Sequence, residues 1–83
     1  EYGDAEIMIR PAWVVYFDKT GNVETTLECD SAYDYSNIGK VYENYTYWGQ
    51  PRIWVYVSAD SLEAAIKIAA EKRAKYLAEK LGL

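Results

Sequence analysis

The sequence predicts an α+β fold in which an antiparallel sheet of three to four strands packs on one long C-terminal helix. Residues 60–82 have the composition and the apolar spacing of an α-helix. Three other segments, 12–17, 23–29 and 51–58, are rich in β-branched and aromatic residues, as strands are. The chain has no repeat or linker, so we expect residues 1–83 to form a single small α+β domain.

The first two strands are expected to form a hairpin. "AWVVYF" and "VETTLEC" are joined by "DKTGN", in which Asp18 and Gly21 are turn-forming residues. The second strand alternates, which predicts that one side faces the helix (Val23, Thr25, Leu27, Cys29, with Trp13, Val15 and Phe17 from the first strand) and the other faces outward (Glu24, Thr26, Glu28). Residues 5–9 are expected to continue the first strand beyond a bend at Pro11.

The middle of the chain, residues 31–50, holds five of the nine tyrosines and is ambiguous. Ile38, Val41, Tyr42 and Tyr45 have helical spacing, but Gly39 interrupts them and most neighbouring residues prefer strands. We expect a short helical turn near 31–37, started by Ser31 or Ser36, and then a strand over 40–48. "WGQP" would close a hairpin onto strand 51–58.

The last segment predicts the long helix. Asp60 lies three residues before Glu63, as in a capping box, and Gly82 stands where the helix would end. The residues of its apolar face share helical spacing: Leu62, Ala65, Ile66, Ala69, Tyr76 and Leu77. Arg73 and Lys80 project near the centre of that face. We expect the helix to overhang the sheet, which leaves these two residues either free to meet an acidic partner or folded back along apolar surface.

Composition excludes several classes of function. The chain has no histidine and only one cysteine, Cys29, so neither a histidine-activated nucleophile nor a transition-metal site is expected. The carboxylate pairs Glu24–Glu28 and Asp30–Asp34 could suit a glycosidase or a calcium ion, but "DSAYD" lacks the spacing of a calcium loop, and the domain is too small to enclose a sugar cleft. We therefore predict no enzyme activity, no metal and no cofactor, and a buried, unreactive thiol.

Charge and hydropathy indicate the kind of partner. The formal net charge is −4, which disfavours nucleic acid and suits a basic partner. No apolar run is long enough to span a membrane, so no membrane partner is expected. A lone thiol favours a reducing compartment, so the expected location is cytoplasmic.

The second hairpin predicts an exposed aromatic surface. Pairing Trp48 with Arg52 places Tyr47 opposite Ile53 and Tyr45 opposite Val55, so Tyr45 and Tyr47 would face the helix. A single helix covers one side of a sheet, so the other side would stay exposed. The residues expected there are Val14, Tyr16, Glu24, Thr26, Glu28, Tyr42, Asn44, Thr46, Trp48, Arg52, Trp54 and Tyr56.

This surface predicts a non-catalytic module that docks onto another protein or onto itself as a homodimer. The predicted contact residues are Tyr16, Tyr33, Tyr35, Tyr42, Trp48, Arg52, Trp54 and Tyr56. An acidic inhibitor of a nucleic-acid-handling enzyme is one concrete form, and the size and composition are similar to those of small α+β proteins of bacteria and phages. A carbohydrate-binding module is the alternative, and the rings could also do no more than pack across strands.

Overall fold

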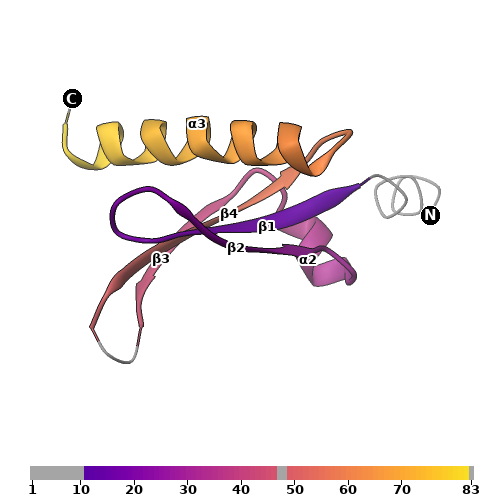
Figure 1. The fold of residues 1–83 in the computed structure, drawn as a ribbon, viewed down its shortest axis with the longest axis horizontal. Helices are drawn as coiled ribbons and strands as arrows, with labels where there is room; N and C mark the ends of the chain where they lie inside the picture. Colours follow the sequence, from indigo (N-terminus) through magenta and orange to yellow (C-terminus); the bar gives the residue numbers. More distant parts are fainter. Residues whose placement is uncertain (1–10, 47–48, 83) are drawn as a thin grey trace.

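A computed structural model describes residues 11–46 and 49–82, and it confirms the α+β fold. Four antiparallel strands form one sheet in the order β2-β1-β4-β3. Figure 1 shows the long helix α3 along one face of this sheet and the short helix α2 on the opposite side. The elements are β1 (Ala12–Phe17), β2 (Val23–Glu28), α2 (Ala32–Ser36), β3 (Val41–Tyr45), β4 (Pro51–Ser58) and α3 (Leu62–Lys80). The expected strand over residues 5–9 lies outside the described residues.

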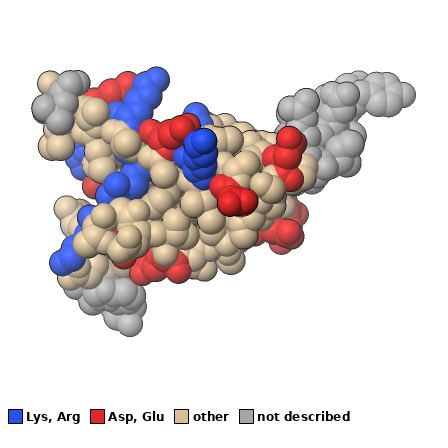
Figure 2. Space-filling model, turned by 45° about the horizontal axis from the view of Figure 1, so that its top comes forward, with Lys and Arg blue, Asp and Glu red and all other residues tan. Residues whose placement is uncertain are grey.

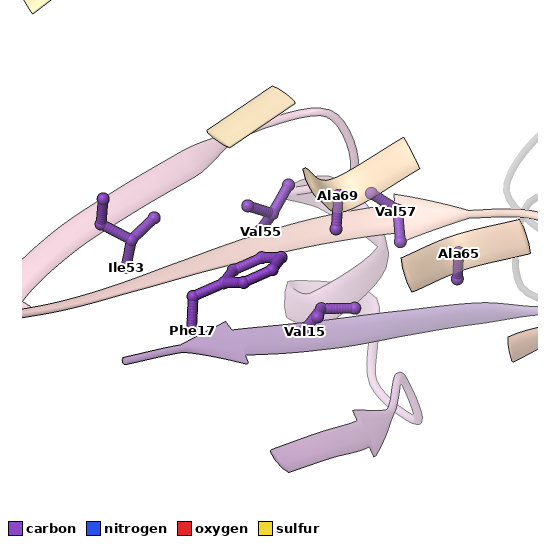
Figure 3. Close-up of a cluster of buried hydrophobic side chains, with 7 residues drawn as sticks. All are labelled: Val15, Phe17, Ile53, Val55, Val57, Ala65 and Ala69. Atoms are coloured by element: carbon purple, nitrogen blue, oxygen red, sulfur yellow. The ribbon is translucent and has the colours of Figure 1, made fainter. Parts of the chain in front are cut away.

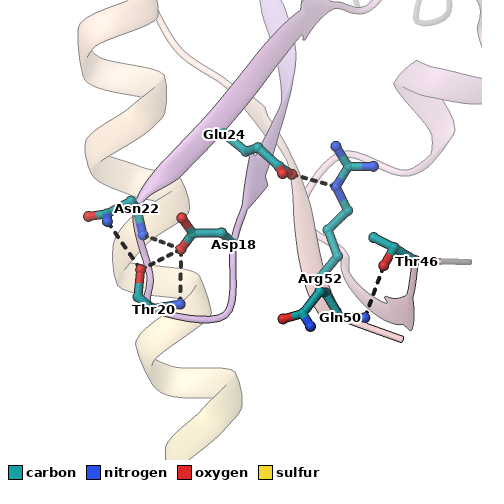
Figure 4. Close-up of polar contacts among 7 residues, drawn as sticks. All are labelled: Asp18, Thr20, Asn22, Glu24, Thr46, Gln50 and Arg52. Carbon is teal, nitrogen blue, oxygen red and sulfur yellow. Dashed lines mark hydrogen bonds and ion pairs between the residues drawn. The ribbon is translucent and has the colours of Figure 1, made fainter. Parts of the chain in front are cut away.

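The β1–β2 turn is built on Asp18, as predicted. Its Oδ1 accepts hydrogen bonds from the Thr20 backbone N–H at 2.9 Å, the Thr20 hydroxyl at 2.7 Å and the Asn22 N–H at 3.0 Å (Figure 4). Gly21 has a φ of 94°, a conformation that residues with a Cβ rarely adopt. These bonds lower the pKa of the Asp18 carboxyl, the Thr20 hydroxyl contributing most.

A bulge in the first hairpin overturns the predicted faces of β2. Tyr16 pairs with Thr25 but Phe17 pairs with Val23, so Glu24 is an extra residue. Because this shifts the alternation by one residue, Thr26 and Glu28 lie on the helix side of the sheet, opposite Val15 and Trp13 respectively. Thr25 and Leu27, which were expected to face the helix, lie on the outer side opposite Tyr16 and Val14. Cys29 is buried as predicted, but in the outer-face cluster with Val14.

The β3–β4 hairpin is shorter than predicted. Arg52 pairs with Asn44 rather than Trp48, and Tyr45 pairs with Pro51 rather than Val55. Thr46 closes the loop, because its Oγ1 accepts from the Gln50 N–H at 2.9 Å (Figure 4). The shift from residue 48 to residue 44 is even, so the strand faces are as predicted. The prediction that Tyr45 is core is wrong, since it sits in the last pair of the ladder and is 66% exposed; Tyr47 and Trp48 lie outside the described residues.

Helix α3 covers the sheet much as expected. It begins one residue later than predicted, since Ser61 is the N-cap and accepts from the Ala64 N–H at 3.1 Å. Gly82, with a φ of 77°, follows its end. Figure 3 shows the core between helix and strands, formed by Val15, Phe17, Ile53, Val55, Val57, Ala65 and Ala69. The two alanines are fully buried, and their small side chains let the helix lie close to the strands.

Arg73 and Lys80 are folded back on the chain rather than free. The Lys80 ammonium binds the Glu43 carboxylate on β3. The Arg73 guanidinium lies 5.8 Å from the centre of the Phe17 ring. It also packs under the hairpin turn, because a Cβ added at Gly21 would lie 2.9 Å from Arg73 Nη1. The end of α3 is therefore bound to the sheet and does not offer these residues to a partner.

Candidate functional site: an aromatic groove on the outer face

The outer face of the sheet, opposite α3, carries a ladder of three aromatic rings, Tyr16, Trp54 and Tyr42 (the aromatic ladder). They are direct cross-strand neighbours on β1, β4 and β3. The ring centres of Tyr16 and Trp54 are 5.8 Å apart with an angle of 28° between planes, and those of Tyr42 and Trp54 are 6.0 Å apart with an angle of 21°. Trp54 therefore has a stacked ring on either side, an arrangement that stabilises the sheet.

Helix α2 covers one end of this face. Tyr35 and Ile38 pack against Val14 and Tyr56, and Tyr56 is only 7% exposed. The prediction that a single helix leaves the whole outer face exposed is therefore wrong at Val14 and Tyr56, which are buried by the chain itself. Burial raises the pKa of the Tyr56 hydroxyl.

The position of α2 depends on Asn37, a buried polar residue just after the helix. Its Nδ2 donates to the Tyr33 carbonyl at 2.9 Å, and its Oδ1 accepts from the Tyr42 hydroxyl at 2.5 Å. Ser31 caps the other end, accepting from the Asp34 N–H at 3.1 Å. These bonds fix the backbone of Tyr33, while its ring remains 67% exposed.

A groove of about 400 Å³ lies between α2 and the β3–β4 hairpin. The aromatic ladder and the exposed Tyr33 border it, and Tyr45, whose side chain alternates toward the helix side of β3, lines it from the end of that strand. Its volume is within the range of about 300–1,000 Å³ that is usual for binding sites. The described residues that line it are Tyr16, Tyr33, Tyr42, Asn44, Tyr45, Thr46, Arg52, Trp54 and Tyr56.

Arg52 is the charged group of the groove, and two contacts hold it in place. Its Nε donates to Glu24 Oε1 at 2.7 Å (Figure 4). Its guanidinium carbon lies 4.9 Å from the centre of the Tyr16 ring. Its two terminal nitrogens have no hydrogen-bond partner among the described residues. Arg52 is thus pre-oriented and still has donors to offer.

The groove holds little that could perform catalysis. Burial, followed by the charges of Asp34 and Asp30, raises the pKa of the nearby Cys29 thiol to about 11, so the thiol stays protonated near neutral pH. Within residues 11–46 and 49–82, no group of acidic or cysteine side chains is placed to hold a metal ion. The groove offers ring surface and hydrogen-bonding groups to a bound molecule.

Most of the predicted contact residues meet in this groove. Tyr16, Tyr33, Tyr42, Arg52, Trp54 and Tyr56 line it, the last of them as a buried residue. Tyr35 does not line it and packs in the cluster beneath α2, and Trp48 is outside the described residues. The sequence reasoning missed Tyr45 as an exposed ring, because the assumed hairpin register placed it opposite Val55.

The comparisons with known proteins return no relative. No family model matches the chain, and no curated protein and no solved structure matches it. Among the described helices, none is both long enough and apolar enough to cross a membrane. Function must therefore be inferred from the geometry of the groove.

Proposed function

We propose that this protein is a non-catalytic interaction module that docks onto another protein through the aromatic groove. The observation that carries the proposal is a pair of tyrosines, Tyr33 and Tyr45, which are 67% and 66% exposed and line one groove from two separate segments. Tyrosine, tryptophan and arginine dominate protein-binding hot spots because they combine area, rigidity and hydrogen bonding. Trp54 and Arg52 supply the other two residue types in the same groove.

Packing within the fold accounts for some of these rings but not for all. The members of the aromatic ladder stack on one another, which is sufficient reason for their presence. Tyr33 and Tyr45 have no stacked partner ring among the described residues, and their exposed surface contributes little to folding. Two such rings on the borders of one groove are better explained by contact with a partner.

The charge of the chain favours a partner with a basic surface. The net charge is −4, and Asp30 precedes α2 while Asp34 lies within its first turn, at one end of the outer face. On the face drawn in Figure 2, most basic side chains lie toward the end at which α3 finishes, and acidic side chains are spread over the whole face. An enzyme that handles nucleic acid has a basic surface, and an acidic chain that occupied this surface would inhibit the enzyme.

The geometry gives less support to carbohydrate binding. Sugars stack on open ring faces, but Trp54 lies between Tyr16 and Tyr42, which sit on the strands to either side of it. Among the described aromatic residues that line the groove, only Tyr33 and Tyr45 are broadly exposed. A titration with oligosaccharides should leave the tryptophan fluorescence unchanged at millimolar sugar, and a saturable shift would favour the carbohydrate alternative.

Affinity capture from a cell lysate, read by quantitative mass spectrometry, tests the proposal. The groove variant combines Tyr33→Ala and Tyr45→Ala, because both rings are exposed and their loss should leave the fold intact. The matched control combines Lys67→Ala and Lys75→Ala on the exposed side of α3. Wild type and control should capture the same proteins and the groove variant should lose them; equal capture by all three chains would contradict the proposal.

Self-association through the same groove is distinguished by light scattering. A wild-type mass that rises to twice the chain mass with concentration, and a groove variant that stays at 9.5 kDa, would identify the partner as a second copy. A constant mass near that of one chain would leave another protein as the partner.

A further inference from the structure

The two edges of the sheet differ in how their backbone groups are satisfied. The order β2-β1-β4-β3 makes β2 and β3 the edge strands. On β3, the Tyr45 N–H donates to Asn44 Oδ1 at 2.8 Å, and the Glu43 side chain is held by Tyr76 and Lys80 of α3. This edge is partly closed by the chain's own side chains.

The backbone pattern of β2 shows which of its groups point away from the sheet. The Cys29 N–H donates to the Ala12 carbonyl at 2.9 Å, so these two residues form a hydrogen-bonded pair. Hydrogen-bonded and non-hydrogen-bonded pairs alternate along an antiparallel ladder. Leu27, opposite Val14, therefore bonds to β1, while Thr26 and Glu28 turn their N–H and C=O groups outward.

These outward groups lie on an accessible edge. Within the described part of the chain, no residue accepts from or donates to the outer edge of Thr26 or Glu28. Every residue of β2 except the half-buried Thr26 is exposed, and Leu27 is 54% exposed. β2 contains neither proline nor lysine, two residues that commonly keep an edge strand from pairing.

We propose that the outer edge of β2 accepts an extended segment of a partner protein as an added antiparallel strand. Charge indicates the composition of that segment. Glu28 and Asp30 have no ion pair among the described residues, so Lys or Arg is favoured opposite Glu28 and Thr26. Leu27 faces the opposite side of the sheet and favours an apolar residue. The segment therefore alternates basic and apolar residues, and its contacts are separate from those of the groove.

A second copy of this chain fits the edge less well. Self-pairing would bring Glu24 and Glu28 of one copy beside the same residues of the other, and like charges across strands are destabilising. Both copies also carry a net charge of −4. The partner favoured by the edge is therefore a basic segment of a different protein.

Fluorescence anisotropy with a labelled seven-residue peptide of alternating Lys and Val tests the backbone contacts. In the proposed register the Lys residues are opposite Thr26 and Glu28, so their N–H groups face β2. N-methylation at the Lys residues should weaken binding about tenfold or more, because hydrogen bonds to the edge are lost. N-methylation at the Val residues should change binding little, and replacing Lys by Glu should abolish it.

Variants of β2 test the same contact by changing the protein instead of the peptide. Thr26→Pro removes one outward N–H but no bond to β1, since Thr26 and Val15 are a non-hydrogen-bonded pair; Thr26→Val is the matched control. Thr26→Pro should lose the peptide, while Thr26→Val and the groove variant should keep it. If the proline variant does not fold, the methylated peptides alone decide the question.

Three results would overturn the proposal: equal binding of both methylated peptides, loss of peptide binding in the groove variant, or a wild-type dimer that Thr26→Pro converts to a monomer. The second would place the peptide in the groove, and the third would assign the edge to a second copy. Because the peptide assay does not use the groove, its failure leaves the proposed docking function to be judged by its own capture experiment.

Discussion

The two faces of the sheet are made by the same strands and yet differ in composition and in cover. The helix face presents Val15, Val55 and Phe17 to a helix of 19 residues and is closed. The outer face presents aromatic rings to a helix of five residues and is closed only at one end, over Val14, Cys29 and Tyr56. The difference indicates that most of the stability resides on the helix face, while the outer face combines ring packing with surface that remains available to a partner.

The largest expected effect is on the helix face. Phe17 is 1% exposed and lies at the centre of the core, so Phe17→Ala should lower the free energy of unfolding by about 3–5 kcal/mol. Urea denaturation followed by circular dichroism measures the change. For a chain of this size such a loss would leave little folded protein. A loss below about 1 kcal/mol would contradict the assignment of the core to this face.

Trp54→Ala should have an intermediate effect. Trp54 is half-buried and stacks between Tyr16 and Tyr42, so its loss should lower the free energy of unfolding by about 1–3 kcal/mol. The same urea measurement compares it directly with Phe17→Ala. If Trp54→Ala were the more destabilising of the two, the outer face would contribute more to stability than the helix face, which would contradict the comparison.

A smaller loss of stability is expected from Tyr42→Phe, at the contact between the outer face and the residue that follows α2. This substitution removes the hydroxyl that donates to Asn37 Oδ1 and leaves that buried oxygen without its partner. The free energy of unfolding should fall by about 1–2 kcal/mol. Hydrogen exchange should show faster exchange at residues 33–39 and unchanged protection in α3. Uniform acceleration across the chain would mean that α2 does not move independently of the sheet.

The smallest effect concerns pH. Hydrogen bonds from Lys80, and then from Tyr76, lower the pKa of Glu43 below its ordinary value of 4.5. A carboxyl with a lowered pKa stabilises the fold above its unfolded pKa, and this stabilisation is lost as the pH falls through the folded value. Glu43→Gln should therefore lower the free energy of unfolding slightly at neutral pH, make the stability curve less steep below pH 4.5, and bring the curves of variant and wild type together at low pH. If the free energy of unfolding of the variant fell as steeply below pH 4.5 as that of wild type, the contact between Glu43 and Lys80 would not be maintained in solution.

Local patterns in the sequence were sufficient for the strongest elements. The apolar and β-branched runs predicted β1 and β4 with their observed bounds, and the spacing of Ala65, Ala69 and Tyr76 predicted the packed side of α3. These features depend on residues that are close in the chain, so the sequence contains the relevant information.

Two features of the outer face depend on backbone geometry and on single side-chain contacts rather than on residue spacing, and the sequence did not reveal them. The bulge that exchanges the sides of β2 arises where Phe17 pairs with Val23, although the alternation of β2 is regular in the sequence. The cover over Tyr56 comes from a helix of five residues, and its place depends on the bond between Asn37 and Tyr42. The sequence therefore predicted most of the residues that line the site, but not which of them are buried and which are exposed.

The central claim is that Tyr33 and Tyr45 serve recognition and not folding. The most direct test compares the Tyr33→Ala/Tyr45→Ala chain with wild type in two readings, the free energy of unfolding and the amount of partner retained at equal protein concentration. The account predicts unfolding free energies within about 0.5 kcal/mol of each other, together with loss of the partner. Retention of the partner at wild-type level by a chain of unchanged stability would contradict it.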